Sequence, residues 1–299
     1  MLLSILLNLS QFNIGVSASG IQRSHPGCVR GLEDRAGAVQ KSHVGCVALL
    51  LLMIISATIL PLPTSAASVS SAYGQNAKKI VIPKHAASTL LPVVNQRDIL
   101  EKHRILADRV LRALPSYCRD HLKNFYVNYE KNPANRGLGG ESTMIITGNV
   151  PDREFMALVT HECGHVTDLG GLRGRDSAQP TPFADGTTPI YGDDPSMAFY
   201  SISWLSPRMM QPNMNDADFV SGYAKSDPFE DFSESFAFYA LQKKEFKRLA
   251  SKNAILKAKY DFMDQVVFGG TEIASSNYKR GKNVPWDVTK LPYVWHAKR

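Results

Sequence analysis

Apolar and polar residues follow each other along this chain in patterns that predict both helices and strands. Apolar side chains recur at near-helical spacing between residues 98 and 114, which predicts an amphipathic helix, and the segment 254–267 has the same character. Residues 125–129 alternate as a strand does, and residues 142–147 form a short β-branched run between glycines. A further strand is expected at residues 79–83. The mixture predicts an α+β fold.

The segment 149–171 carries signals for both ends of another helix. Pro151 suits the first helical turn, and the acidic side chains of Asp152 and Glu154 favour the positively polarised N-terminal end. A pair of glycines at 170–171 stops the helix. We therefore expect a helix that begins close to Pro151 and ends just before these glycines.

The last part of this helix contains the sequence His161-Glu162-Cys163-Gly164-His165. Residues four apart lie on one face of a helix, so His161 and His165 can direct imidazole nitrogens at one metal ion. Glu162 can then reach a water on the same ion and act as a general base. The pattern is typical of zinc peptidases. The alternative is an amphipathic helix with two partly exposed histidines.

The strand expected at residues 142–147 directly precedes this helix. Zinc peptidases place at this point the sheet edge that binds an extended peptide through main-chain hydrogen bonds. An ordinary sheet strand is the alternative, and the sequence does not distinguish the two.

A catalytic zinc ion usually has three protein ligands, so a third ligand is needed. The metzincin pattern is excluded because Asp168 stands at its glycine position and Gly171 at its last histidine position. The segment 186–192 resembles the aspzincin pattern but is one residue short and lacks the ligand aspartate. Three aspartates flank that segment, however: Asp185, Asp193 and Asp194.

A second helix, expected at residues 228–241, supplies a better third ligand. Glu230 and Glu234 lie four apart on one face, so Glu230 can bind zinc while Glu234 accepts a hydrogen bond from the far nitrogen of His161. Taken alone, two glutamates at this spacing also fit a solvated helix face. Tyr223 precedes Glu230 by seven residues, and its phenol could donate a hydrogen bond to the oxyanion of a tetrahedral intermediate.

These two blocks resemble the catalytic domain of anthrax lethal factor and the related Pro-Pro endopeptidases, which are gluzincins. The first block of that family, HExGHxxD, is matched from His161 to Asp168, and the second is matched from Tyr223 to Phe236. The resemblance implies a zincin-like domain with a small mixed sheet over the two-histidine helix and a mostly helical C-terminal part. It covers only two short blocks, so Pro-Pro specificity is not carried over.

The connection between the two blocks departs from the family. Residues 172–222 are rich in Gly, Pro and Asp and are longer than the family usually has. Long connections in compact domains tend to be functional or mobile, so we expect a lid or specificity loop here. A calcium site formed by three carboxylates is a further hypothesis: Asp185, Asp193 and Asp194. The aromatic run at residues 199–204 is expected to belong to the core.

The N-terminal region has the outline of a secretory signal. Residues 44–60 form a nearly unbroken apolar run, preceded by Lys41 and followed by small residues that allow cleavage near Ala66. An uncleaved membrane anchor is the alternative; in both cases the C-terminal part lies outside the cytoplasm. Residues 1–43 fit a signal poorly, which suggests a start codon assigned too far upstream. We expect residues 67–95 to form a linker.

Two cysteines would remain after such cleavage, Cys118 and Cys163. Cys163 lies in the two-histidine helix at a position that need not face the metal, so a small buried thiol is the preferred interpretation. A disulfide, which an exported protein could form, is the alternative.

The charge of the chain excludes one class of function. The 34 basic and 27 acidic residues give a formal net charge of +7, a mild excess that is scattered along the chain. The basic cluster at residues 243–248 is interpreted as the solvated end of a helix, and no reading motif appears, so nucleic acid is not an expected partner.

The sequence therefore predicts a zinc-dependent endopeptidase of protein or peptide substrates, secreted or tethered through residues 44–60. The N-terminal extension and signal occupy residues 1–66, and the catalytic domain residues 96–299. A non-catalytic zincin-like binding module at the cell surface is the alternative. The predicted site is Zn²⁺ bound by His161, His165 and Glu230, with Glu234 behind His161, Glu162 as general base and Tyr223 at the oxyanion.

Overall fold

The computed structural model of this chain describes residues 89–296. The strand expected at residues 79–83, the apolar run at residues 44–60 and the proposed cleavage region lie outside the described residues. Within residues 89–296, no helix is long and apolar enough to cross a membrane.

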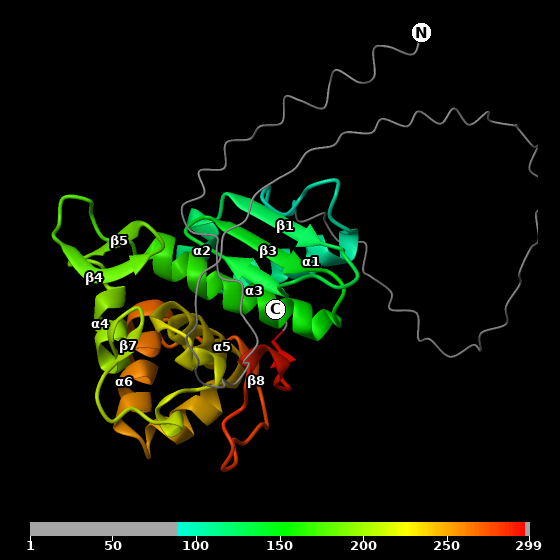
Figure 1. The fold of residues 1–299 in the computed structure, drawn as a ribbon. Coiled ribbons are helices and arrows are strands. Elements are labelled where there is room, and N and C mark those ends of the chain that lie inside the picture. Colours follow the sequence, from blue (N-terminus) through cyan, green and yellow to red (C-terminus); the bar gives the residue numbers. More distant parts are fainter. Residues whose placement is uncertain (1–88, 297–299) are drawn as a thin grey trace, which may run out of the picture. The chain divides into compact units, whose positions relative to one another are not determined.

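A small mixed sheet lies above helix α3 in Figure 1. Its strands are β1 (Asn124–Asn128), β2 (Gly137–Gly139) and β3 (Thr143–Thr147), in the order β1-β3-β2. β1 runs parallel to β3, whereas β2 runs antiparallel to it. The strands expected at residues 125–129 and 142–147 are therefore present. β3 is the central strand, so the ordinary-strand interpretation of residues 142–147 is correct, and the sheet edge beside α3 is β2.

Helices α1 (Glu101–Ala113) and α2 (Ser116–His121) precede this sheet. The amphipathic helix predicted at residues 98–114 is confirmed, because α1 buries its apolar face against α3. The ring of His103 on that face stacks on Phe155 of α3, with 4.4 Å between ring centroids. Val94, in the expected linker, is also buried in the core.

Helix α3 (Asp152–Val166) is the centre of the described fold and continues into a π-helical turn (Thr167–Gly171). It begins after Pro151 and ends at the glycines, as predicted. Every residue from Phe155 to Val166 is buried, because α3 contacts α1, the sheet and α5. Polar side chains on such a helix need partners inside the protein.

Residues 172–222 fold into regular structure rather than into one long loop, which corrects the sequence-based expectation. The elements are two hairpins, a helix and a 3-10 turn: β4 (Pro180–Asp185), β5 (Thr188–Tyr191), α4 (Ser196–Ser203), β6 (Trp204–Ser206), β7 (Met209–Met210) and Asp216–Asp218. The aromatic run is part of the core as predicted, since Phe199, Tyr200 and Trp204 are buried. The Gly, Pro and Asp residues mark turns, but β5, β6 and β7 are too short to show a regular alternation of apolar and polar residues.

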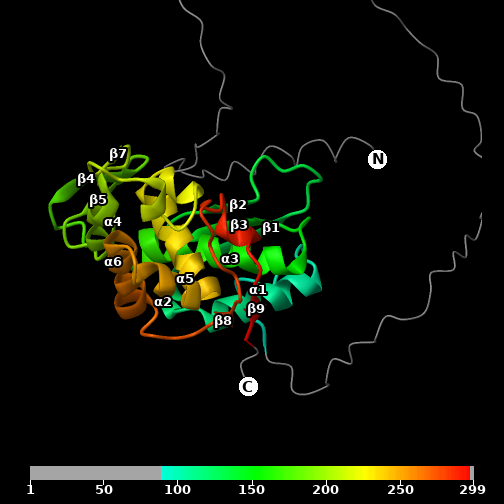
Figure 2. The ribbon, with the colours of Figure 1, turned by 90° about the horizontal axis from the view of Figure 1, so that it is seen from below.

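Helices α5 (Pro228–Ala250) and α6 (Ala254–Phe262) lie on the opposite side of α3 from the sheet (Figures 1 and 2). The helix predicted at residues 228–241 is thus confirmed and extends further, and that at 254–267 continues as a π-helical turn (Met263–Val267). The Asp227 side chain caps α5 by accepting from the backbone N–H groups of Phe229 and Glu230, each at 3.0 Å.

A buried ion pair joins α5 to α6. Lys259 Nζ lies 2.7 Å from Asp231 Oδ2, and both side chains are fully buried. Trp204 donates its indole N–H to the same carboxylate at 3.0 Å. Buried charges require such partners, so this cluster holds the first turn of α5 in a defined place.

The C-terminal segment returns to the start of α5. It contains β8 (Ala274–Ser275), a 3-10 turn (Val288–Lys290) and β9 (Val294–Trp295), which pairs antiparallel with β8. The backbone N–H of Tyr223 donates to the carbonyl of Trp286 at 2.8 Å, which fastens this segment beside the residues that precede α5.

Cys118 of α2 and Cys163 of α3 form a disulfide, with 5.4 Å between their Cα atoms. The preference for a free buried thiol at Cys163 was therefore wrong. The two positions are 45 residues apart, and only the packing of α2 against α3 places their side chains together. Both are fully buried, so the disulfide links α2 to the two-histidine helix inside the protein.

Candidate metal centre

Helices α3 and α5 cross at an unusually short distance. A Cβ atom added to Gly164 would lie 2.7 Å from the Cα atom of Ser233 on α5, which is closer than packing allows. Only glycine at this position lets the two backbones approach so closely. The crossing brings the first turns of α5 under the two histidines of α3.

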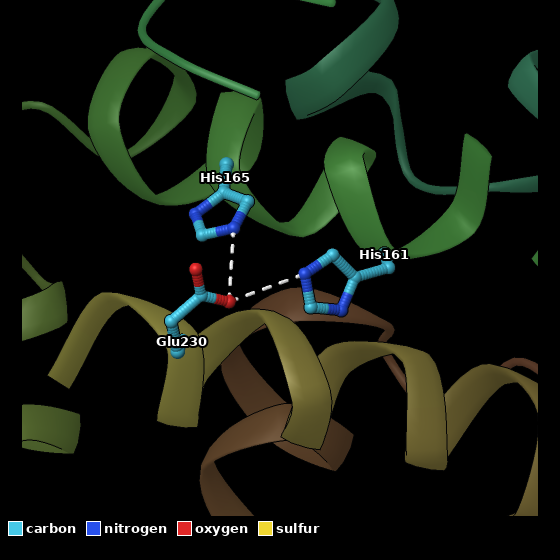
Figure 3. Close-up of side chains that lie close together, drawn as sticks. All are labelled: His161, His165 and Glu230. Atoms are coloured by element: carbon cyan, nitrogen blue, oxygen red, sulfur yellow. Dashed lines mark ion pairs between the residues drawn. The ribbon is translucent and has the colours of Figure 1, made fainter. Parts of the chain in front are cut away.

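Three side chains converge at this crossing (Figure 3). The Nε2 atoms of His161 and His165 lie 3.3 and 3.4 Å from the same oxygen, Oε2 of Glu230. All three candidate ligand atoms lie within 4.8 Å of one another, and among residues 89–296 this is the one group of acidic, histidine and cysteine side chains with such spacing.

The spacing of these atoms fits a tetrahedral metal ion. When bonds to zinc are about 2.0–2.1 Å long, neighbouring ligands of a tetrahedral site lie about 3.3–3.4 Å apart. The two separations between a histidine nitrogen and Glu230 Oε2 match that value, and all three ligand atoms lie within 4.8 Å of one another. The buried Glu230 Oε2 also accepts no hydrogen bond with standard geometry, so a cation would satisfy it. Two imidazoles and one carboxylate are a ligand set that zinc accepts.

Glu234 lies one turn further along α5 and contacts the far side of His161. Its Oε1 atom lies 2.9 Å from His161 Nδ1, and its Oε2 atom accepts from the backbone N–H of Val288 at 3.0 Å. A proton on Nδ1 shared with Glu234 leaves the lone pair of Nε2 directed toward Glu230. The two side chains are thus in contact as expected, although the expected hydrogen bond between Nδ1 and Oε1 does not have standard geometry in the structure.

Glu162 points toward the edge strand β2. A Cβ atom at Gly137 would lie 2.0 Å from Glu162 Oε1, and one at Gly139 would lie 2.8 Å from Oε2. Two glycines of the edge strand thus leave the room that the carboxylate occupies. The glycines were visible in the sequence, but their role depends on the packing of β2 over α3.

Tyr223 completes the group from the segment that precedes α5. Its hydroxyl donates to Glu230 Oε1 at 2.9 Å, while Glu230 Oε2 faces the histidines. The Tyr223 ring also stacks near that of His161, with 6.1 Å between centroids. The phenol therefore lies at the candidate metal centre, where the sequence placed it, and its partner in the structure is a carboxylate.

The charges around the histidines favour a cation. Burial by itself lowers the pKa of His161, but its contacts with Glu230 and Glu234 raise that pKa well above the usual value. Burial tends to raise the pKa of Glu230, yet the neighbouring His165 and His161 hold it well below its usual value. Because these carboxylates stabilise positive charge on the rings, they would also stabilise a metal ion between them.

Asp168, the last residue of the first family-like block, is not one of the candidate ligands. It accepts a hydrogen bond from the hydroxyl of Tyr200 at 2.7 Å, and burial raises its pKa to about 8. This interaction joins the π-helical turn after α3 to α4. Asp168 therefore has a place in the packing of the chain behind the two-histidine helix.

Sequence reasoning missed Arg136, which precedes β2. Its guanidinium donates to Glu154 of α3 at 2.8 Å and also pairs with Asp287 of the C-terminal segment. Arg136 and Asp287 are 151 residues apart, so no local pattern announces their contact. This ion-pair cluster fastens the C-terminal segment beside the edge strand and the metal-centre helices.

The calcium hypothesis is not supported. Asp193 accepts from the Arg175 guanidinium at 2.8 Å, and Asp194 accepts from the backbone N–H of Ser196 at 2.8 Å at the start of α4. These carboxylates form hydrogen bonds within their own segment of the chain. With Asp185 they do not form a metal-binding group within the described part of the chain.

No family model, curated protein or solved structure matches the chain. Fold and site together define an α+β protein in which two crossing helices hold a buried group of two histidines and a glutamate.

Proposed function

We propose that this protein is an exported zinc-dependent endopeptidase of the gluzincin type. The observation that carries the proposal is the convergence of His161 and His165 on one oxygen of Glu230, at 3.3 and 3.4 Å, with Glu162 next to the first histidine in the chain. Gluzincin ligands have this order along the chain, two histidines on one helix and a glutamate on a later one.

His161, His165 and Glu230 would hold the ion. Zinc bound there would supply Lewis-acid chemistry, by polarising the scissile carbonyl and lowering the pKa of a water molecule. Glu234 orients His161 through Nδ1.

Two side chains handle the proton and the developing charge. Glu162 accepts the proton of the attacking water on its carboxylate and then delivers it to the leaving amine. Tyr223 donates a hydrogen bond from its phenol to the oxyanion, for which the hydroxyl must leave its present partner, Glu230 Oε1. The edge strand β2 next to Glu162 offers main-chain groups to an extended peptide.

Export is supported by two features. The apolar run at residues 44–60 has the outline of a signal, and the Cys118–Cys163 disulfide suits an oxidising compartment. In a reducing cytoplasm such a bridge would rarely persist.

The proposal is tested with the protein purified from the secretory pathway of a host and loaded with zinc. Cleavage of a mixed peptide library is mapped by mass spectrometry, with Glu162→Gln as the matched variant. We expect cuts by the wild type alone and equal zinc content in both proteins. A folded, zinc-loaded wild type that makes no cuts would instead support the non-catalytic binding module.

A further inference from the structure

A hollow of about 330 Å³ is lined in part by residues close to Tyr223 in the chain. Gly222 and Lys225, which line it, flank Tyr223 in the chain, and the C-terminal segment supplies the other wall with Lys282, Asn283 and Trp286. The volume lies at the lower end of the range of ligand pockets, about 300–1,000 Å³, and suits one or two side chains of a peptide. The hollow belongs neither to the ligand set nor to the edge strand.

A row of three rings connects this hollow to the metal centre. The centroids of His161 and Tyr223 are 6.1 Å apart, and those of Tyr223 and Trp286 are 6.3 Å apart. Trp286 therefore lies no more than 12.4 Å from the ring of His161. Since an extended peptide advances about 3.3 Å per residue, the hollow is within about four residues of a bond cleaved at the metal.

Trp286 has a fixed backbone and an exposed side chain. Its carbonyl accepts from Tyr223, and the two residues that follow it contact Arg136 and Glu234. The indole lies against Gly222, where an added Cβ would come within 2.7 Å of it, yet 70% of the residue is exposed. A large aromatic side chain held in place and left open to solvent is typical of a binding contact.

The hollow also carries a surplus positive charge. Asp216 also lines the hollow, and its carboxylate pairs with Lys225 Nζ at 2.7 Å, so these two charges offset each other. Lys282 lies on the opposite wall and forms no ion pair with any residue between 89 and 296. A carboxylate that enters the hollow would therefore meet one uncompensated ammonium group beside an aromatic surface.

We propose that this hollow is a substrate subsite for an acidic side chain of the peptide, with Lys282 pairing with its carboxylate and Trp286 packing against the adjoining peptide chain. This inference rests on the proposed peptidase function. It assigns the substrate class to peptides with Asp or Glu within about four residues of the cleaved bond.

The test starts from a peptide that the wild type cuts and compares variants of that peptide with Glu or Gln at each of four positions on either side of the bond. We expect the wild type to favour Glu at one of these positions by about fivefold in kcat/KM. Lys282→Glu should abolish or invert this preference. Lys252→Glu makes the same charge change just beyond the far end of α5 and should leave the preference intact.

The aromatic contact is tested separately. Trp286→Ala should lower kcat/KM at least about fivefold through KM, whereas Trp286→Phe should retain most of it. The inference is overturned if the wild type cuts peptides without a preference for Glu at any position, or if Lys282→Glu keeps the wild-type preference.

Binding separates this inference from the proposed function. If the zinc-loaded wild type cuts no peptide, the peptidase proposal fails, and the binding of labelled Glu- and Gln-containing peptides is measured by fluorescence polarisation. A preference for Glu that disappears in Lys282→Glu would keep the subsite in a binding protein. Equal binding of both peptides would remove the subsite as well.

Discussion

The carboxylate of Glu234 lies 2.9 Å from Nδ1 of His161, on the side of the ring that faces away from Glu230. The two side chains come from different helices and are both buried, so the contact fixes the orientation of the imidazole. The position of the candidate ligand His161 therefore depends on Glu234, a residue that would not itself bind the metal.

Replacement of Glu234 by Gln should weaken zinc binding about 10- to 100-fold, because the amide supports the donating Nδ1 less well than a carboxylate does. Zinc affinity is measured by competition with a chelator. Glu245→Gln makes the same change on α5 at a buried site where the partner is Arg248, and it should leave zinc affinity unaltered. Equal affinities for all three proteins would exclude this role of Glu234.

Gly164→Ala should separate α3 from α5. The added Cβ would meet the Ser233 backbone at 2.7 Å, and relief of that clash moves Glu230 away from the histidines. We expect a loss of about 1–3 kcal/mol in the free energy of unfolding of the metal-free protein, together with weaker zinc binding. Gly140→Ala is the control, because a Cβ there has no neighbour within 4 Å. If Gly164→Ala binds zinc as the wild type does, the close crossing is not what places Glu230.

Tyr223→Phe should reduce kcat by a factor on the order of 10²–10³, the usual effect of removing one oxyanion donor. Its zinc content should hardly change, because the Tyr223 hydroxyl contacts Oε1 of Glu230 and not the oxygen that faces the histidines. Steady-state cleavage and metal analysis measure the two effects. Tyr126→Phe, at a partly exposed phenol on β1, serves as control. An unchanged kcat would remove Tyr223 from the mechanism.

Removal of the disulfide should destabilise the protein strongly. Its cysteines are 45 residues apart in the chain, and the chain-entropy relation gives about 4 kcal/mol for a loop of that length. We expect the double variant Cys118→Ala/Cys163→Ala to unfold at lower urea concentration than the wild type. A reductant should shift the wild type toward the variant and leave the variant unchanged. Identical unfolding of the wild type with and without reductant would contradict the bridge.

Much of the candidate site follows from local sequence. The four-residue spacings of His161 with His165 and of Glu230 with Glu234 place each pair on one helix face, wherever those helices lie. The ends of α3 and the start of α5 were also predictable, because proline, acidic residues and glycines act within one turn of the helix.

Tertiary structure decided what joins segments distant in the sequence. It made β2 rather than β3 the sheet edge, paired Cys118 with Cys163, and folded residues 172–222 into hairpins and a helix. It also placed Trp286 beside Tyr223. Such contacts depend on which surfaces pack together, and a pattern of neighbouring residues does not contain that information. The sequence determined which side chains each helix carries. The crossing of α3 and α5 at Gly164 determined that His161, His165 and Glu230 converge at one site.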